Sequence, residues 1–476
     1  MSQEIQEVDV AIIGGGPGGY VAAIRAAQLG LKAALVEKEK LGGICLHKGC
    51  IPTKTLLRSA EIYHEAKEGR KYGILIDALS IDFAQVQRRK EEIVEQLHKG
   101  IQFLLKKGKI SVYEGYGRIL GPSIFSPQAG AVSITKENGE SEIVYPRHVI
   151  IATGSRPRLL PGLPFDGEKV MTSDEALMMQ KLPKSILIVG GGVIGVEWAS
   201  LLSDFGVEVT IVESMDRILP FEDEEISKEM TRIFKKRKVN ILTKVKLLPE
   251  TVNLEGDGVT AKGIQEGKEI EFHAEKMLVS VGRAANVEDI GLENTSIEVD
   301  QGVIKVNSFY QTKEPHIYAI GDCIGGLQLA HVASHEGIVA VEHIAGLHPD
   351  PINYAHVPKC TYSRPQVASV GLTEKEAIER GHRVKTGKVQ FRAIGKALIK
   401  GEPDGFAKIV MDEKTKDLLG VHLIGPEVTE LISESALGLF LNATPWEIHH
   451  SIHPHPTLSE IMAEAAMAIE GESIHG

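Results

Sequence analysis

The sequence predicts an α/β fold that contains two copies of one strand, turn, helix and strand unit, followed by an α+β domain. In each copy a short apolar run leads into a glycine-rich turn, and a second apolar run ends in a glutamate. Short apolar runs separated by helical patterns are typical of a parallel sheet with helices on its faces. Beyond residue 351, alternating segments such as Gln366–Gly371 and Phe406–Met411 indicate an antiparallel sheet with helices.

The first copy, residues 8–37, has the features of a Rossmann-like dinucleotide-binding unit. Its strand, glycine turn, helix and second strand are expected at Val8–Ile13, Gly14–Gly19, Tyr20–Leu29 and Ala33–Val36. Gly14 would make the tight turn, Gly16 would let backbone amides approach a pyrophosphate, and Gly19 would allow close packing of the helix on the strand. Glu37, after the second strand, would hold the ribose hydroxyls of an adenosine.

The second copy repeats the first, with the same 23-position spacing from its first glycine, Gly190, to its glutamate, Glu213. Its strand, glycine turn, helix end and second strand are expected at Ser185–Val189, Gly190–Gly195, Leu202 and Val207–Val212. Two matched units predict two bound dinucleotides. The carboxylate of Glu213 would accept ribose hydroxyl protons and repel a 2′-phosphate, which favours NAD over NADP. No arginine occupies the next three positions, although Arg217 follows closely.

Two cysteines five positions apart, Cys45 and Cys50, stand beside glycines in a chain that has only four cysteines. Five residues of an undistorted helix advance about 7.5 Å, more than a disulfide tolerates between Cα atoms, so the backbone between them must bend. Gly49 supplies conformational freedom there, and a helix is expected to begin at Lys54. Thiols near a helix N-terminus and near cations such as Lys48 and Lys54 have lowered pKa values. The pattern predicts redox chemistry. Two reduced structural cysteines or half of a zinc site are the alternatives, and no metal is expected without a second cysteine pair.

The segments between these motifs also show regular patterns. Residues 60–107 are charged with apolar positions three or four apart, which predicts an amphipathic helical hairpin packed on the first domain. Residues 110–119 and 131–144 alternate like antiparallel strands. Val149–Ser155 is typical of a buried strand that runs into a small-residue turn, where the backbone could pass close to a cofactor. Proline and glycine are frequent over residues 157–164, which indicates a linker.

The block of residues 453–460 begins His453-Pro454-His455-Pro456, with His455 between two prolines, and ends in Glu460. The prolines restrict the backbone at His455, and Glu460 lies about a turn onward, where it could hold one ring nitrogen. An imidazole oriented in this way can act as general base and acid for a thiol. A surface histidine cluster or a weak metal patch is the alternative. Upstream, Asp322 ends a strand pattern and could accept hydrogen bonds from the polyol chain of a flavin, or could be a turn residue.

Composition excludes several classes of protein. The 476 residues are enough for about three domains, and 43% hydrophobic with 25% charged residues is typical of soluble globular proteins. A net charge of -11 argues against nucleic-acid binding. No uncharged apolar run reaches membrane-spanning length, because Arg25 and Glu197 interrupt the two candidates. The N-terminal residues resemble no targeting signal, so we expect the reducing cytoplasm, where a disulfide is more often catalytic than structural.

Together these features resemble the flavin-dependent pyridine nucleotide-disulfide oxidoreductases over essentially the full chain. The motifs that carry the resemblance are Gly14–Gly19 with Glu37, Gly42–Lys54, Ala152–Ser155, Gly190–Gly195 with Glu197 and Glu213, Gly321–Asp322, Leu329–His331 and His455–Glu460. The resemblance implies FAD in the first unit, NAD in the second, and an obligate homodimer in which the terminal domain supplies His455 to the other subunit's cysteines. It further implies a discontinuous FAD-binding domain, an NAD-binding domain and an interface domain, over residues 1–150 with 281–350, 151–280 and 351–476.

The resemblance also implies roles for individual residues. Cys45 would exchange with the substrate, Cys50 would contact the flavin, and His455, oriented by Glu460, would take a proton from a dihydrolipoyl thiol. The dihydrolipoyl group would arrive on a lipoyl domain of an acyltransferase or carrier protein of a 2-oxo acid dehydrogenase or glycine cleavage complex, and NAD would accept the hydride. The positions implied to contact FAD are Gly14, Gly16, Gly19, Glu37, Lys54, Gly117, Thr153, Gly154, Ser155, Asp322 and Ala330. Those implied to contact NAD are Gly190, Gly192, Gly195, Glu213, Val245 and Gly282.

Some positions depart from the family pattern, although none removes a reacting atom. They are Ile44, His47–Lys48, Thr53 and Ala284–Asn286. Three other enzymes with this pattern are alternative interpretations. A glutathione reductase would carry cations in place of Glu213. A mercuric reductase would add a terminal cysteine pair, and a transhydrogenase would lack Cys45. From another class, a flavin-bound subunit that only binds partners would not need the thiols together with His455 and Glu460.

Overall fold

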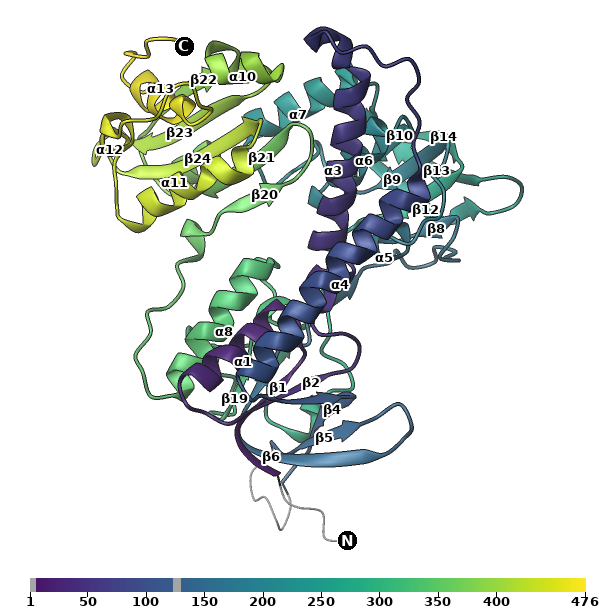
Figure 1. The fold of residues 1–476 in the computed structure, drawn as a ribbon, viewed down its shortest axis with the longest axis vertical. Helices are drawn as coiled ribbons and strands as arrows, with labels where there is room; N and C mark the ends of the chain where they lie inside the picture. The colour runs from purple at the N-terminus through teal and green to yellow at the C-terminus, as the bar shows by residue number, and fades with distance from the viewer. Residues whose placement is uncertain (1–5, 123–129) are drawn as a thin grey trace. The chain divides into compact units, whose positions relative to one another are not determined.

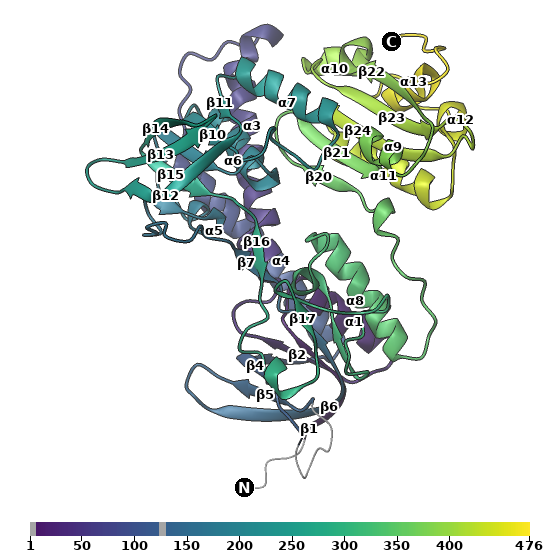
Figure 2. The same ribbon diagram turned by 180° about the vertical axis from the view of Figure 1, so that it is seen from behind.

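The computed structural model describes residues 6–122 and 130–476, which belong to two compact units (Figures 1 and 2). The first unit contains the chain up to Thr55, Gln85–Arg158 and Arg283–Ile352. The second unit contains Leu56–Ala84, Leu159–Gly282 and Asn353–Gly476. The change of unit after Arg158 falls inside the predicted linker. Residues 1–5, part of the stretch that resembled no targeting signal, lie outside the described residues.

The first unit is built on a sheet whose strands follow the order β3-β2-β1-β6-β5-β4, with β19 also paired to β6. Its strands are β1 (Gln6–Ile13), β2 (Ala33–Glu37), β3 (Ser111–Glu114), β4 (Tyr116–Ile119), β5 (Val132–Thr135), β6 (Ser141–Ile151) and β19 (Ile317–Ala319). The β1, α1 (Pro17–Gln28), β2 unit confirms the first predicted copy, with β1 and β2 parallel. The antiparallel prediction is right for β4, β5 and β6 but wrong for β3, which is parallel to β2.

Both faces of this sheet are buried, as a near-continuous apolar strand requires. On β1, Val10 and Ile12 pack into one core, while Ala11 and Ile13 pack into another on the opposite face. The remaining helices of this unit are α2 (Gly43–His47), α4 (Phe83–Lys107), α8 (Ala330–Ile344) and the short η2 (Leu292–Asn294) and η3 (Gly321–Ile324). Two small ladders add to it: β7 (Ser155–Pro157) with β16 (Arg283–Ala285), and β17 (Val299–Asp300) with β18 (Val303–Ile304).

The predicted helical hairpin consists of α3 (Cys50–Lys67) and α4, joined through the short helix η1 (Gly69–Tyr72). Its placement on the first domain alone is wrong for α3. That helix begins in the first unit, but from Leu56 onward it belongs to the second. There the ring of Tyr63 lies 6.1 Å from that of Phe205. The amphipathic pattern therefore identified the helix without identifying its neighbours.

The second unit contains a parallel sheet of order β11-β10-β9-β15-β8. Its elements are β8 (Val170–Met171), α5 (Ser173–Ala176), β9 (Ser185–Val189), α6 (Val193–Asp204), β10 (Glu208–Val212), α7 (Glu224–Lys236), β11 (Asn240–Leu242) and β15 (Lys276–Val279). An antiparallel sheet packs its apolar residues into the same core and comprises β12 (Val245–Asn253), β13 (Val259–Gln265) and β14 (Lys268–Ala274). The parallel pairing of β9 with β10 confirms the second predicted copy.

The rest of the second unit is the predicted α+β arrangement, an antiparallel sheet of order β20-β21-β24-β23-β22 with helices packed on it. Its strands are β20 (Lys359–Thr361), β21 (Gln366–Gly371), β22 (Val384–Gln390), β23 (Phe406–Asp412) and β24 (Leu418–Gly425). Its helices are η4 (Tyr354–His356), α9 (Glu374–Glu379), η5 (Phe391–Ala393), α10 (Gly395–Lys400), α11 (Val428–Phe440), α12 (Pro445–His450) and α13 (Glu460–Ala468). Across the described parts of the chain, every helix is too short or too polar to cross a membrane.

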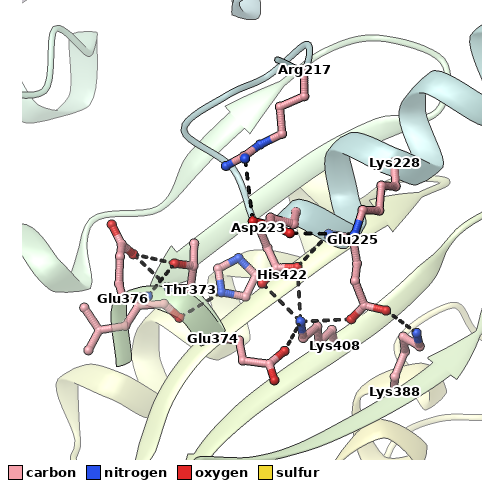
Figure 3. Close-up of polar contacts among 12 residues, drawn as sticks. Arg217, Asp223, Glu225, Lys228, Thr373, Glu374, Glu376, Lys388, Lys408 and His422 are labelled. Atoms are coloured by element: carbon pink, nitrogen blue, oxygen red, sulfur yellow. Dashed lines mark hydrogen bonds and ion pairs between the residues drawn. The ribbon is translucent and has the colours of Figure 1, made fainter. Parts of the chain in front are cut away.

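A buried lysine on β23 joins α7 to the β20-β21-β24-β23-β22 sheet (Figure 3). The ammonium of Lys408 on β23 lies 3.1 Å from both carboxylate oxygens of Asp223, 2.9 Å from Glu225 and 2.7 Å from Glu374. Burial acts to lower the pKa of Lys408, but these carboxylates raise it above its usual value. Burial likewise acts to raise the pKa of Asp223, and the cations around it hold that pKa low. Lys408 and Asp223 are therefore both ionised. Removing either one would leave the other as an uncompensated buried charge.

We expect a Lys408→Met variant to unfold more easily, by about 3 kcal/mol, because three carboxylates lose their shared buried cation. The urea midpoint of the holoenzyme at neutral pH measures the loss. The lowered pKa of Asp223 contributes stability above its unfolded-state pKa, and that contribution disappears as the pH falls through its folded-state value. The difference in urea midpoint between wild type and Lys408→Met should therefore become smaller toward pH 4. Lys388→Met, which removes an exposed pair with Glu225 and an ammonium 5.4 Å from the ring centroid of Phe406, is the control; an equal loss in both variants would contradict the prediction.

Candidate active site

The two cysteines lie where one short helix ends and a longer one begins. Cys45 is in α2, and Cys50 is the first residue of α3. The chain leaves the helix between them, which confirms the predicted bend, and α3 begins four residues earlier than the expected Lys54. Gly49 does not have a positive φ. Instead, a Cβ at Gly49 would lie 3.1 Å from the carbonyl oxygen of Ile44, so the residue permits a close approach.

The side chains of Cys45 and Cys50 are reduced thiols that are hydrogen-bonded to each other. This hydrogen bond, followed by burial, raises the pKa of Cys45, whereas the charge of Lys54 acts to lower it. The expectation of a lowered pKa is therefore wrong for Cys45 in the reduced pair. The ammonium of Lys48 forms an ion pair with Glu39, 2.7 Å from its carboxylate.

The first glycine turn leaves open space in front of a helix N-terminus. Gly14 has φ +108°, and a Cβ there would lie 2.1 Å from the oxygen of Ala152; a Cβ at Gly19 would lie 1.8 Å from the oxygen of Gly14. By contrast, a Cβ at Gly16 would lie no closer than 4.0 Å to any of its neighbours. Gly16 caps α1 without a side-chain hydrogen bond, so the first amides of that helix are available to an anion. These residues fit a pyrophosphate.

The acid after the second strand is held by the same turn. Glu37 accepts hydrogen bonds from the backbone N–H groups of Gly15 and Glu39, both at 2.7 Å. These bonds orient the carboxylate at the carboxyl end of β2, beside the open glycine turn. The Glu37 carboxylate predicted to contact the ribose is therefore held in one orientation by the backbone. Sequence reasoning did not anticipate that the backbone would position it.

The second glycine turn repeats this geometry. A Cβ at Gly190 would lie 2.4 Å from Ser280 O and one at Gly195 would lie 1.9 Å from Gly190 O, while Gly192 has no atom within 4 Å. Glu213 accepts from the N–H of Gly191 at 2.6 Å and that of Met215 at 2.7 Å. The two units are therefore alike in geometry as well as in spacing, and both fit a dinucleotide.

Arg217, which left the choice between NAD and NADP open, is engaged by its own loop. Its guanidinium donates to Pro220 O at 2.9 Å and lies 3.8 Å from Asp216 and 3.7 Å from Glu224. A 2′-phosphate would have to compete with both carboxylates. The loop therefore supports the NAD preference predicted from Glu213.

The other positions implied to contact FAD form a small network in the first unit. The Ser155 hydroxyl donates to Asp322, and Arg283 donates to Ser155 Oγ at 2.7 Å. Thr153 Oγ1 donates to the Asn286 carbonyl at 2.6 Å. Ser155 is buried, so its side chain holds Asp322 in place and does not face a ligand. Sequence reasoning missed Arg283 and Asn286, because they lie about 130 positions from their partners.

The remaining predicted contacts differ in how accessible they are. Gly154 and Gly282 have positive φ, and no atom lies within 4 Å of the place that a Cβ would take at either glycine; Ala330 is the first residue of α8. A Cβ at Gly117 would press on Ile13 and Val36, so this glycine permits strand packing. Val245 is buried in the core and contributes only backbone, with its N–H donating to Glu213 O at 2.9 Å.

His455 and Glu460 form a pair in the second unit. His455 Nδ1 lies 2.8 Å from Glu460 Oε1, and Glu460 Oε2 accepts from the Thr457 N–H at 2.9 Å. Because the His455 side chain is 78% exposed, its Nε2 is open to solvent. Burial acts to raise the pKa of Glu460, but the bonds from His455 and Thr457 lower it. The predicted orientation of one ring nitrogen is present, so the imidazole can act as a base through the other.

Two groups beside the redox loop were not anticipated. Burial, and then the charge of Cys45, raise the pKa of Tyr20, which places that phenol near the thiol. His47 Nε2 and His98 Nδ1 both lie 2.9 Å from Leu41 O, with their rings 5.3 Å apart. His47 is one of the departures from the family pattern, so its position gave a signal. Tyr20 and His98 looked like ordinary helix residues.

Comparison with known proteins agrees with this geometry. Residues 8–337 match the model of the pyridine nucleotide-disulphide oxidoreductases, and residues 357–466 match the dimerisation domain of the same family. A dihydrolipoyl dehydrogenase from Bacillus subtilis is 62% identical over 98% of this chain and 99% of its own, and one from Zymomonas mobilis is 46% identical over the same shares. The crystal structure of LpdA from Mycobacterium tuberculosis has a TM-score of 0.89 at 27% identity, covering 97% of this chain and 99% of that one.

The chain belongs to the pyridine nucleotide-disulphide oxidoreductase family. It is an enzyme, its cofactors are FAD and NAD, and its match to the family's dimerisation domain indicates a homodimer. Within the family, the full-length relatives at 62% and 46% identity are dihydrolipoyl dehydrogenases.

Proposed function

We propose that the chain reoxidises dihydrolipoyl groups through Cys45 and Cys50 and passes the electrons by way of FAD to NAD+. Its activity is that of a dihydrolipoyl dehydrogenase, the enzyme named for its full-length relatives. The observation that carries the proposal is the presence of two thiols hydrogen-bonded to each other, one in α2 and one at the start of α3, together with an exposed imidazole held by Glu460. Oxidation of a dithiol needs both a disulfide that accepts electrons and a base that takes protons.

The two glycine turns are proposed to hold the two cofactors. FAD would lie against Gly14, Gly16 and Gly19 with Glu37 at its ribose, and also against Lys54, Gly117, Thr153, Gly154, Asp322 and Ala330, with Ser155 supporting Asp322. NAD would lie against Gly190, Gly192 and Gly195 with Glu213 at its ribose, and also against Gly282 and the backbone of Val245. When bound, FAD takes the electron pair from the thiols and delivers it to NAD+ as hydride.

The protein residues carry out the thiol exchange. In the oxidised enzyme the sulfur atoms of Cys45 and Cys50 are joined. His455 Nε2 takes the proton of one substrate thiol, and the resulting thiolate attacks Cys45 Sγ, which releases Cys50 as a thiolate and forms a mixed disulfide. The second substrate thiol then attacks the substrate sulfur of that bond, closes the lipoyl disulfide and releases Cys45.

The protons balance in this scheme. One of the two substrate protons stays on His455 and the other is transferred to Cys45, while the enzyme sulfurs gain the two electrons that the substrate loses. A proton transferred to Cys45 in this way would stay hydrogen-bonded to the neighbouring Cys50 sulfur. Glu460 keeps the proton of His455 Nδ1 in place, so that Nε2 is the basic nitrogen.

Partners and location follow from the same proposal. His455 of one subunit would serve the thiols of the other, through an interface domain at 351–476 that follows an FAD domain at 1–150 with 281–350 and an NAD domain at 151–280. The dihydrolipoyl group would arrive on a lipoyl domain of an acyltransferase or carrier protein, within a 2-oxo acid dehydrogenase or glycine cleavage complex. We place this reaction in the cytoplasm.

The test is anaerobic NADH formation from dihydrolipoamide by the holoenzyme. We expect turnover with dihydrolipoamide and NAD+, and at least about tenfold less with NADP+, because Glu213 repels a 2′-phosphate. In the reverse direction NADH should reduce lipoamide, whereas glutathione disulfide serves as the control substrate. An enzyme that ignores dihydrolipoamide but reduces glutathione disulfide with NADPH would refute the proposed substrate.

A further inference from the structure

Residues 473–475 fold back onto α13, the helix whose first residue is Glu460. The buried carboxylate of Glu464 is the point of attachment. Its Oε2 accepts hydrogen bonds from Ser473 Oγ at 2.7 Å, Ile474 N at 3.0 Å and His475 N at 3.1 Å, and its Oε1 lies 2.7 Å from His475 Nδ1. The reaction proposed above uses none of these four residues.

Glu464 stands one helical turn from the carboxylate that orients His455. Side chains four positions apart share a helix face, so the negative charges of Glu460 and Glu464 oppose each other. Burial acts to raise the pKa of Glu464, but the hydrogen bonds from Ser473 and His475 lower it. The charge of His475 also helps to lower the pKa of Glu460, after the bonds from His455 and Thr457. The attached segment thus offsets the repulsion between the two carboxylates.

The other charged groups packed near α13 are engaged elsewhere. His453 lies 2.9 Å from Glu434 of α11, a bond that raises the pKa of His453; its charge also interacts with Glu460. The remaining groups and their partners are Glu447 with Thr444, His450 with Trp446 and with the ring of His449, Lys385 and Lys416 with Glu470, Lys388 with Glu225, Asp412 with His382, and Lys408 with Asp223, Glu225 and Glu374.

We propose that Glu464 and His475 are positioning residues for the His455–Glu460 pair. They act through α13: the segment 473–475 fixes the helix that carries Glu460, and the imidazole of His475 compensates the charge of Glu464. The proposal rests on the proposed function, because it concerns the base that takes the substrate proton. It assigns a catalytic consequence to a segment that touches neither the thiols nor His455 in the contacts described.

The two substitutions change the net charge on Glu464 in opposite directions, and the test measures this difference. His475→Ala removes a hydrogen-bond partner of the Glu464 carboxylate and leaves its negative charge less compensated, so the apparent pKa of the pair should rise and the acid limb of kcat/KM for dihydrolipoamide should move to higher pH. Glu464→Gln removes an anion, so the same limb should move to lower pH. Each shift is expected to be on the order of half a pH unit, with a fall of about tenfold in kcat/KM at the optimum from the lost charge-assisted hydrogen bonds.

Controls separate this role from general damage. NADH oxidation by ferricyanide does not require a base for thiols, so both variants should keep it within about twofold of wild type. His475→Asn restores a hydrogen-bond donor for Glu464 and should recover both kcat/KM and the position of the limb. Glu470→Gln, which removes ion pairs with Lys385 and Lys416 but no contact of Glu464, should behave as wild type.

Three outcomes would overturn the inference. Shifts of the acid limb in the same direction in both variants, or no shift, would remove the electrostatic argument. An equal fall in the dihydrolipoamide and ferricyanide activities would show only a structural role; if Glu464→Gln fails to fold, His475→Ala decides alone. A wild-type enzyme without dihydrolipoamide activity would instead refute the proposed function itself.

Discussion

A Cys45→Ser enzyme should lose NADH formation from dihydrolipoamide by at least about 10³-fold, because a hydroxyl cannot form the mixed disulfide. The loss should appear in kcat at saturating substrate. Cys50→Ser should lose as much, since no thiolate would remain to pass electrons onward. Single-turnover measurements under anaerobic conditions check both variants, and the thiol titre of each protein confirms the substitution.

The same preparations supply the controls for this prediction. Oxidation of NADH by ferricyanide bypasses the thiols and should stay within about threefold of wild type in Cys45→Ser. Cys360→Ser, which replaces a half-buried thiol of β20, should leave both activities unchanged. Dihydrolipoamide turnover that persists without Cys45 would exclude the proposed thiol route.

Replacing the base should have the second largest effect. His455→Gln is expected to lower kcat/KM for dihydrolipoamide by roughly 10² to 10⁴-fold, the usual contribution of a positioned general base. Glu460→Gln should cost less, because the imidazole remains but loses its acceptor at Nδ1. A pH series distinguishes the two: the loss in His455→Gln should shrink at alkaline pH, where substrate thiolate forms without a base.

The chain offers a matched control for this pair. His382 Nδ1 lies 2.7 Å from Asp412 in the antiparallel sheet, so it forms a histidine–carboxylate pair of similar geometry away from Glu460. His382→Gln should leave dihydrolipoamide turnover unchanged. Equal losses in the two histidine variants would contradict a specific role for His455.

The sequence predicted those features of the fold that depend on neighbouring residues. The order of apolar run, glycine turn, helix and glutamate lies within about 30 positions in each copy, and both copies form as expected. The strands at 366–371 and 406–411 were recognised from their alternating pattern. In the site, the bend between Cys45 and Cys50 and the contact between Glu460 and His455 likewise involve residues only five positions apart.

Features that depend on distant residues could not be predicted in this way. The parallel pairing of β3 with β2 depends on where a chain about 70 residues away returns to the sheet. The raised pKa of Cys45 depends on burial and on the direction of one S–H bond, neither of which has a sequence pattern. The sequence around Lys408 did not predict that Asp223 and Glu374, far away in the chain, would lie against its ammonium.

The first unit is assembled from three separated stretches of the chain, and its sheet includes β19, which pairs with β6. A ribosome therefore has to synthesise more than 300 residues before β19, the last of the strands that pair with β6, is available. Asp322 and Ala330 emerge at the same late stage. Until then, the early segment that carries both cysteines lacks part of its own core. Contacts between such distant segments form slowly, so the sheet of the first unit is completed only late in synthesis.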